Sequence, residues 1–126
     1  MKVVGLDHLV LTVEDVEATI EFYTRVMGMS VRAFERGRLA LRFGSQKINL
    51  HEAGREFEPH ARRPIPGSSD LCFVTEANLD EWLEHLSAGG VEVVEGPVSR
   101  LGALGPMTSI YFRDPDGNLI EVASYS

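Results

Sequence analysis

The sequence predicts an α+β protein made of two β-α-β-β-β modules that enclose a cleft. Each half of the 126-residue chain opens on a strand-like stretch, continues into an amphipathic helical stretch and then returns to strand-like stretches. Glycines and other turn residues separate these stretches. Because the same order of elements occurs twice, an internal repeat is the economical interpretation.

The first half supplies one module. Residues 6–13 are rich in branched side chains, which is typical of a strand. Asp15 can cap a helix whose apolar residues recur at helical spacing, and Gly28 ends that run. Three further strands are expected at residues 30–36, 38–43 and 47–53.

The second half repeats this order. Residues 70–75 predict a strand, and Asn78 with Glu81 three residues later resembles a capping box. Gly89 and Gly90 end the helix that follows. Further strands are expected at residues 91–96, around 98–101, at 107–113 and at 118–124, the last two separated by the turn "DPDG".

The expected organisation is therefore one domain, residues 1–126, with two modules inside it. The first module covers residues 5–53 and the second covers residues 70–124. Residues 54–69 form an inter-module loop, which is long for a compact domain and typical of a lid or linker. Each module is expected to hold a twisted antiparallel sheet with one concave face.

Composition and charge argue against nucleic acid and membrane as partners. The net charge of −7 argues against nucleic acid, which requires a basic surface. No apolar run is long enough for a membrane span. The single cysteine excludes an intrachain disulfide and suits a reducing compartment, so we expect a cytoplasmic protein.

Aligning the two modules brings four chemically active residues into register. "DHLVLTV" over "SDLCFVT" places His8 opposite Asp70, and "NLHEA" over "LIEVA" places His51 opposite Glu121. Taken alone, each residue has an ordinary explanation: a hydrogen-bonded histidine, an edge glutamate or a turn aspartate. Together they predict a metal site facing one cleft. Such ligands suit Zn, Ni, Co, Mn or Fe(II).

Three stretches, "LDHLVLTV", "YTRVMGM" and "FRDPDGNLIEV", resemble the vicinal oxygen chelate superfamily, which includes glyoxalase I, bleomycin-resistance proteins and extradiol dioxygenases. The resemblance covers essentially the whole chain. The stretch from Arg38 to Thr75 and the stretch from Gly96 to Val122 look most similar to the glyoxalase domain-containing protein 5 type.

The resemblance implies a function and a set of site residues. His8, His51 and Glu121 match the superfamily's metal-ligand positions, whereas the fourth position often holds a histidine and here holds Asp70. The implied enzyme is a metal-dependent lyase or isomerase of glyoxalase I type. It would act on a small oxygen-bearing substrate chelated to a divalent metal, through an enediolate-type intermediate, with Glu121 or Asp70 moving the proton. A homodimer is also implied, with or without exchange of modules.

Three alternatives stay open within the resemblance. An Fe(II) dioxygenase ranks lower, because ring-cleaving members have longer chains and His60 and His85 are the only spare histidines. A thiol transferase of fosfomycin-resistance type would also use a metal held by these ligands. A non-catalytic small-molecule-binding protein is the third alternative, although such members typically lack the ligands.

Overall fold

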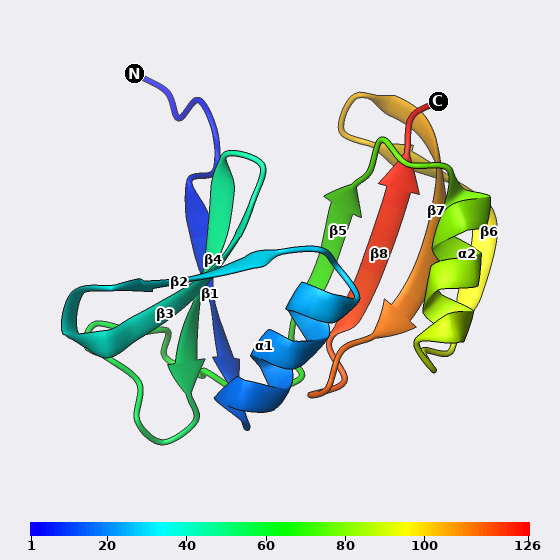
Figure 1. The fold of residues 1–126 in the computed structure, drawn as a ribbon. Coiled ribbons are helices and arrows are strands. Elements are labelled where there is room, and N and C mark those ends of the chain that lie inside the picture. Colours follow the sequence, from blue (N-terminus) through cyan, green and yellow to red (C-terminus); the bar gives the residue numbers. More distant parts are fainter. The chain divides into compact units, whose positions relative to one another are not determined.

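The computed structural model describes residues 1–126 and divides into two compact units, each described here by itself. Unit 1 is Met1–Pro66 and unit 2 is Gly67–Ser126. Each unit contains a four-stranded sheet and one α-helix (Figure 1). The predicted α+β class and the repeated β-α-β-β-β order are confirmed.

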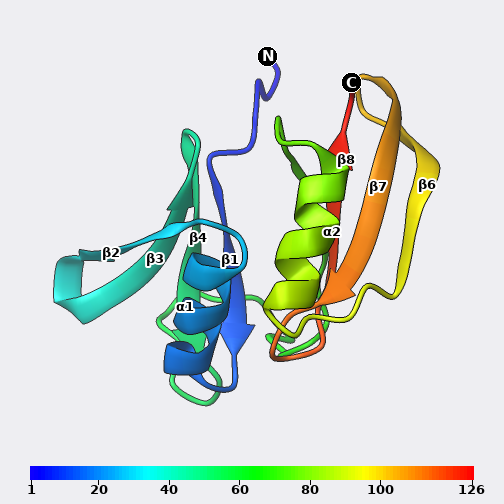
Figure 2. The same ribbon diagram turned by 45° about the vertical axis from the view of Figure 1, so that its right-hand side comes forward.

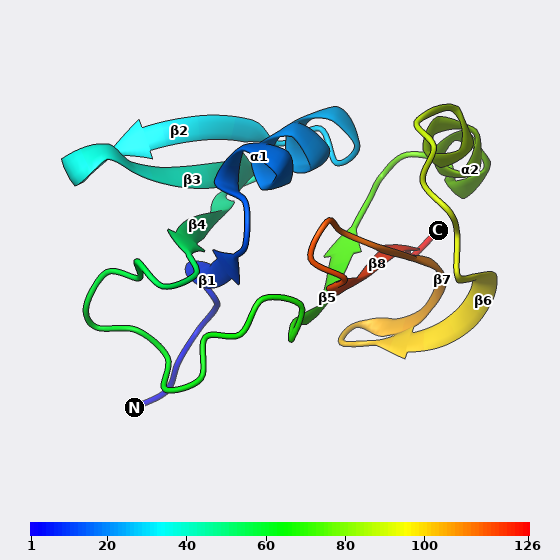
Figure 3. The same ribbon diagram turned by 90° about the horizontal axis from the view of Figure 1, so that it is seen from below.

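Unit 1 begins on its sheet and adds its helix after the first strand. Its elements are β1 (His8–Val13), α1 (Val16–Arg25), β2 (Ser30–Phe34), β3 (Arg38–Phe43) and β4 (Gln46–Glu52). The predicted cap is present, because the Asp15 side chain accepts a hydrogen bond from the Ala18 backbone N–H at 3.1 Å. Figures 1 and 3 show α1 lying across one face of this sheet.

Unit 2 repeats the arrangement, and α2 lies over one face of its sheet (Figure 2). Its elements are β5 (Asp70–Val74), α2 (Leu79–Ala88), β6 (Glu95–Gly102), β7 (Gly105–Arg113) and β8 (Leu119–Ser124). The Asn78 side chain caps α2 by accepting from the Asp80 backbone N–H at 2.7 Å.

The strand expected at residues 91–96 is wrong. Residues 91–94 form no strand, and β6 begins at Glu95 and includes the stretch around 98–101. Val91 instead completes the end of α2, since its N–H donates to the Leu86 carbonyl at 2.9 Å after the positive-φ Gly90. The apolar alternation of this stretch therefore does not produce a strand.

The expectation of wholly antiparallel sheets is also wrong. The strand orders are β1-β4-β3-β2 and β5-β8-β7-β6. The three later strands of each unit pair antiparallel, but β1 pairs parallel with β4 and β5 pairs parallel with β8. Two parallel strands need a crossover connection rather than a hairpin. The helix and the two strands between them supply it in each unit.

In each sheet, one face is apolar and the other is polar. Side chains alternate along a strand, so Leu11 and Val13 point to one face of β1 while His8 and Thr12 point to the other. The apolar residues form the cores and are nearly or completely buried: Leu11, Val13, Leu41, Ile48 and Leu50 in unit 1, and Ile110, Phe112, Ile120 and Val122 in unit 2. The opposite, polar faces carry the residues that the sequence predicts to be site residues.

The turn between β7 and β8 holds the start of β5 in place. The buried Asp114 carboxylate accepts hydrogen bonds from the Asp116 N–H, the Asn118 N–H and the Asn118 side-chain amide, at 2.8 to 2.9 Å. The Asn118 Oδ1 in turn accepts from the Ser69 N–H at 2.8 Å. This network fixes the residue that immediately precedes Asp70.

Residues 53–69 connect β4 to β5 without helix or strand, and Figure 3 shows their long path. The division between the units falls within this segment, after Pro66. Neither α-helix has the length and hydrophobicity needed to cross a membrane.

Candidate functional site

The polar face of the unit 2 sheet contains a hollow of about 520 Å³. Asp70 from β5 and Glu121 from β8, both expected from the sequence to be site residues, line it. The register pairs Asp70 with Leu119, so Glu121 lies two residues further along the same direction. At about 3.3 Å per residue, the two positions are roughly 7 Å apart along the strands. The structure therefore places these two carboxylates at one hollow.

The Glu121 carboxylate is oriented by a neighbouring hydroxyl. The buried Ser109 on β7 donates from its Oγ to Glu121 Oε2 at 2.6 Å. A hydrogen bond of this kind fixes the direction of a carboxylate, as the outer-shell partners of metal ligands do. Ser109 was not identified from the sequence, because its role depends on the pairing of β7 with β8.

A tyrosine and an arginine form the opposite side of the hollow. Tyr111 on β7 pairs across the ladder with Glu121. Arg100 on β6 donates from Nε to the Tyr111 hydroxyl oxygen at 2.9 Å and forms an ion pair with Glu95. Because Arg100 can only donate, the tyrosine oxygen is the acceptor, and the tyrosine's own proton is donated to the Glu121 carboxylate. Burial is the main cause that raises the pKa of Tyr111, so the hydroxyl stays protonated at neutral pH.

Cys72 lies beside Asp70 and Glu121, and the pKa of its thiol depends on their charges. It is exposed on the sheet face and pairs with Glu121, and the pKa of its thiol is raised to about 11. Although the residue as a whole is exposed, partial burial of its thiol against the sheet is the largest cause, followed by the charge and hydrogen bond of Glu121 and then the charge of Asp70.

We expect Cys72 to be alkylated slowly by iodoacetamide at pH 8, because the thiolate is the nucleophile and a higher pKa leaves less of it. The Glu121→Gln variant removes the neighbouring charge and should react several-fold faster. Alkylation rates followed by mass spectrometry, with Glu84→Gln on the surface of α2 as control, measure this. Equal rates in all three proteins would contradict the placement of Glu121 beside the thiol.

In unit 1, His8 has a partner that orients its ring. The Nδ1 of His8 lies 2.8 Å from an Asp7 carboxylate oxygen, and both residues are exposed. This leaves Nε2 without a competing bond from Asp7. A histidine held through one ring nitrogen by a carboxylate is a recurrent arrangement around protein-bound metals.

The structure does not bring His51 beside His8. The two residues share the polar face of the sheet, but β1 and β4 pair His8 with Lys47 and Thr12 with His51. His51 is therefore four residues further along the strands, which corresponds to roughly 13 Å. Side chains that leave a sheet in parallel at that separation cannot close on one metal ion.

The internal alignment that placed His51 opposite Glu121 is wrong by two residues. In unit 1 the ladder pairs Val10 with Asn49, and in unit 2 it pairs Cys72 with Glu121. If His8 corresponds to Asp70, then Val10 corresponds to Cys72, and Asn49 takes the place of Glu121. Asn49 was not identified from the sequence. Laying "INL" over "IEV" would have found it.

No three His, Cys, Asp or Glu side chains form a group that could hold a metal within the structure. His8 belongs to unit 1, while Asp70 and Glu121 belong to unit 2. Within unit 2, the carboxylates of Asp70 and Glu121 are hard ligands that suit a divalent metal, and within unit 1 the His8 imidazole is a borderline ligand. The hydrogen bonds from Asp7 to His8 and from Ser109 to Glu121 also match the support that such ligands require.

The fold coincides with that of a known family. The model of the Glyoxalase/Bleomycin resistance protein/Dioxygenase superfamily matches residues 5–122. The chain belongs to this superfamily. Its fold, with two four-stranded sheets and few helices, is the superfamily's fold.

Several relatives of this superfamily member cover nearly all of it. Glyoxalase domain-containing protein RDO1 of Mycosarcoma maydis is 59% identical over 99% of this chain and 70% of its own length. Virulence protein STM3117 of Salmonella typhimurium is 54% identical over 95% of this chain and 83% of its own. The structure of integron cassette protein VCH_CASS1 of V. cholerae has a TM-score of 0.98 and 56% identity, covering 100% and 98% of the two chains.

Members with enzyme names are more distant. Metallothiol transferase FosB of Bacillus licheniformis is 30% identical over 96% of this chain and 75% of its own. Lactoylglutathione lyase of Agrobacterium tumefaciens, at 24% identity and a TM-score of 0.73 over 96% and 93% of the two chains, shares the fold. The superfamily therefore includes enzymes of more than one reaction class.

Proposed function

We propose that this protein is a metal-dependent enzyme of glyoxalase-like lyase or isomerase type that acts on a small oxygen-bearing substrate. The observation that supports it most is the hollow of unit 2, where two carboxylates face a protonated tyrosine. A carboxylate that can take a proton and a hydroxyl that can donate a hydrogen bond are complementary groups for moving a proton next to a substrate oxygen.

In this proposal His8, Asp70 and Glu121 hold the metal. When bound, a divalent cation supplies Lewis-acid stabilisation of negative charge that develops on a substrate oxygen. Zn, Ni, Co, Mn and Fe(II) all suit this donor set. His51, which the sequence placed in the ligand set, is left out because of its separation from His8 along β1 and β4.

The remaining chemistry belongs to the residues of the hollow. Glu121, directed by Ser109, accepts the proton from substrate carbon, or Asp70 does so if Glu121 is fully engaged. The Tyr111 hydroxyl, which accepts from Arg100 and hydrogen-bonds to Glu121, donates its proton in a hydrogen bond to a substrate oxygen that replaces Glu121 as its partner. Arg113 and Arg100 also line the hollow and attract an anionic substrate.

Metal content tests the proposal. We expect wild-type protein, loaded with a divalent metal and desalted, to retain about one equivalent. The His8→Ala and Glu121→Ala variants should retain less than a tenth of it, and Ser109→Ala should weaken the affinity about 10- to 100-fold as an outer-shell change. Elemental analysis gives the readout, and Glu84→Ala on the exposed surface of α2 is the matched carboxylate control. Equal, negligible metal in all these proteins would refute a metalloenzyme.

The Asp70→Ala variant distinguishes two roles for Asp70, metal ligand and catalytic base. If Asp70→Ala loses the metal, Asp70 is a ligand. If it keeps the metal but loses turnover, Asp70 is the base. Turnover is measurable with the thiol adduct of a ketoaldehyde as the first substrate to test.

A thiol transferase is the second candidate, favoured by the 30% identity to the FosB of Bacillus licheniformis. Metal-loaded protein that consumes a thiol in the presence of fosfomycin, but does not convert the thiol adduct of a ketoaldehyde, would favour this candidate. The Fe(II) dioxygenase has no separate observation in its favour. The non-catalytic binding protein has one, the likeness to TnmS3, an antibiotic binding protein from Streptomyces sp. CB03234, at 25% identity and a TM-score of 0.76 over 100% and 99% of the two chains.

The homodimer stays a prediction. The β6–β7 hairpin exposes Leu101 and Leu104 almost fully, at 81% and 88%, and exposed apolar side chains of this size are common where chains associate. Size-exclusion chromatography with light scattering should give twice the mass of 13.9 kDa at micromolar concentration. A mass of one chain would refute it.

A further inference from the structure

The polar face of the unit 1 sheet carries a second cluster of functional groups, which lies further along β4 than Lys47, the residue that pairs with His8. It consists of Phe34, Arg38, Asn49, His51 and Phe57, and we call it the Arg38 cluster. Arg38 and His51 face each other across β3 and β4, and Asn49 is two residues before His51 on the same face. All five residues belong to unit 1.

Three polar atoms of this cluster are buried without a hydrogen-bond partner: Arg38 Nε, Asn49 Oδ1 and His51 Nδ1. Asn49 and His51 are only 6% and 2% exposed. A buried polar group without a partner costs free energy, and such groups are rare in folded proteins. Three of them on adjacent positions of two paired strands indicate that a ligand supplies the missing partners.

The hydrogen-bonding character of the three atoms is defined. Arg38 Nη2 lies 3.5 Å from His51 Nε2, and an arginine nitrogen can only donate, so Nε2 is the acceptor. Burial, followed by the Arg38 charge, lowers the pKa of His51 and keeps its ring neutral. The neutral ring then carries its proton on Nδ1. The cluster thus offers two donors, Arg38 Nε–H and His51 Nδ1–H, and one acceptor, Asn49 Oδ1.

The charge around these atoms favours an anion. The Arg38 guanidinium lies over the Phe34 and Phe57 rings, with its central carbon 5.2 and 4.6 Å from their centroids, and it forms no ion pair with a carboxylate. The Lys47 ammonium lies over Phe34 at 4.2 Å. Glu56, whose charge acts on His51, accepts a hydrogen bond from the Gly54 N–H at 2.9 Å. No carboxylate therefore forms an ion pair with Arg38, and Glu56 is the carboxylate whose charge acts on His51 beside it.

Phe57 covers the cluster from the segment between β4 and β5. Its ring packs edge-on against His51, with 5.6 Å between ring centroids, and it is 37% exposed. Because Phe57 is in neither a helix nor a strand, its movement would uncover the cluster without breaking a strand ladder.

We propose that the Arg38 cluster binds the carboxylate and hydroxyl groups of a small α-hydroxy acid. The two carboxylate oxygens accept from Arg38 Nε–H and His51 Nδ1–H, and the α-hydroxyl donates to Asn49 Oδ1. The dianion of a phosphate monoester does not fit equally well, since its terminal oxygens only accept and would leave Asn49 Oδ1 without a donor. This subsite lies within unit 1 and does not depend on the metal proposed above.

NMR titration of metal-free protein in EDTA tests the proposal, because it excludes any contribution from a metal site. The probes are glycolate, acetate (which lacks the hydroxyl) and glycolamide (which lacks the charge). We expect glycolate to shift the Arg38 Nε–H signal and the β3 and β4 amides saturably. Glycolamide should bind at least about tenfold more weakly, as loss of a charge-assisted hydrogen bond predicts, and acetate should also bind more weakly than glycolate.

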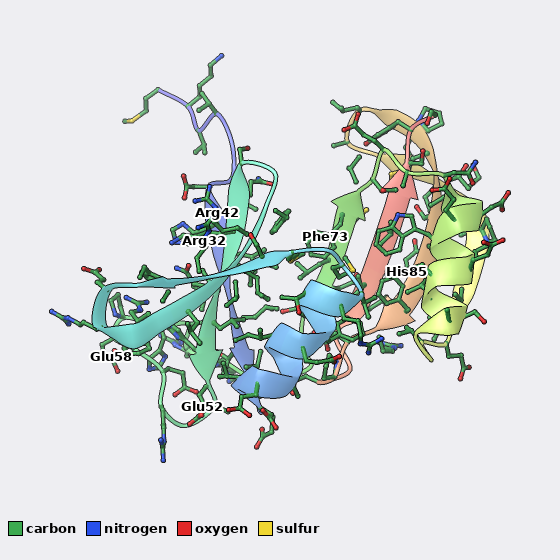
Figure 4. The ribbon with its side chains drawn as sticks, viewed as in Figure 1. Arg32, Arg42, Glu52, Glu58, Phe73 and His85 are labelled. Carbon is green, nitrogen blue, oxygen red and sulfur yellow. The ribbon has the colours of Figure 1, made fainter.

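Variants distinguish glycolate binding by the Arg38 cluster from attraction by the general positive charge of this sheet face. Arg38→Met should weaken glycolate binding by about tenfold or more. Arg32→Met removes an equal charge from the same face, where Arg32 and Arg42 are exposed diagonal neighbours (Figure 4), and should change it less than twofold. Asn49→Leu should abolish the preference for glycolate over acetate. Thermal unfolding confirms that each variant is folded, and Arg38→Lys, which keeps the charge but loses Nε–H, replaces Arg38→Met if that variant unfolds.

Three results would overturn the proposal. One is the absence of a saturable shift with glycolate, which would mean that water satisfies the three atoms. Another is an equal loss in Arg38→Met and Arg32→Met, which would mean diffuse electrostatic attraction. The third is equal binding of glycolate and glycolamide. None of these results bears on metal retention by His8 and Glu121, so the two proposals fail independently.

Discussion

Replacing Gly96 with alanine is expected to lower the free energy of unfolding of unit 2 by about 3 kcal/mol or more. Gly96 adopts a φ of +109°, which L-residues rarely adopt. A Cβ at this position would lie 2.5 Å from the Ser109 carbonyl oxygen and 2.9 Å from the Ile110 Cα. Both atoms belong to the backbone of β7, so no side-chain rotation relieves the contact.

Urea denaturation followed by the fluorescence of Trp82, the single tryptophan of the chain and a residue of α2, measures this effect. Gly105→Ala is the matched control, because Gly105 also has a positive φ, of +134°, but no atom lies within 4 Å of its added Cβ. It should lose only the backbone strain, about 1–3 kcal/mol. Equal losses in the two variants would show that strain, and not the approach of β6 to β7, requires glycine at position 96.

Asp114→Ala is expected to cost about 3 kcal/mol, because removal of a buried carboxylate leaves its donors without partners. Those donors are two backbone N–H groups and the Asn118 amide. Since Asn118 also holds the Ser69 N–H, the start of β5 and the position of Asp70 should loosen as well.

Two measurements follow the change. Urea denaturation gives the stability, and amide hydrogen exchange at Ser69 gives the local loosening, which should accelerate at least about tenfold. Glu92→Ala, an exposed carboxylate outside any helix or strand, should stay within about 0.5 kcal/mol of wild type. A stable Asp114→Ala variant with unchanged exchange at Ser69 would contradict the role of the turn network.

Most of the architecture could be predicted from local signals. The caps at Asp15 and Asn78, the glycines at positions 28 and 90, and the "DPDG" turn each act through nearby atoms, so the sequence is sufficient to locate them. Residues 91–96 failed as a strand because the end of α2 uses the Val91 N–H, which is a competing local requirement.

The site could be predicted only in part, and the reason is register. Aligning Glu121 with His51 or with Asn49 preserves the alternation of the strand, because the two choices differ by two residues and the side-chain period is two. The hydrophobic pattern therefore cannot choose between them. Only the hydrogen-bond ladder between β1 and β4, compared with that between β5 and β8, decides for Asn49.

The residues around the site were missed for a related reason. Ser109 and Tyr111 act on Glu121 across a strand pair, and Arg38 meets His51 across another. Such contacts depend on tertiary pairing, which composition and spacing along the chain do not encode.

The parallel pairing of the first strand with the last also bears on how each unit acquires its structure. The partner of β1 begins 38 residues after it, since His8 and Gln46 are the first residues of β1 and β4. During synthesis, β1, which carries His8, therefore cannot pair until β2, β3 and β4 have left the ribosome. Contacts between residues so far apart in sequence raise the contact order and slow folding. The hairpins of β2, β3 and β4, whose contacts are local, are thus expected to form first. We then expect β1 to pair with the free edge of β4.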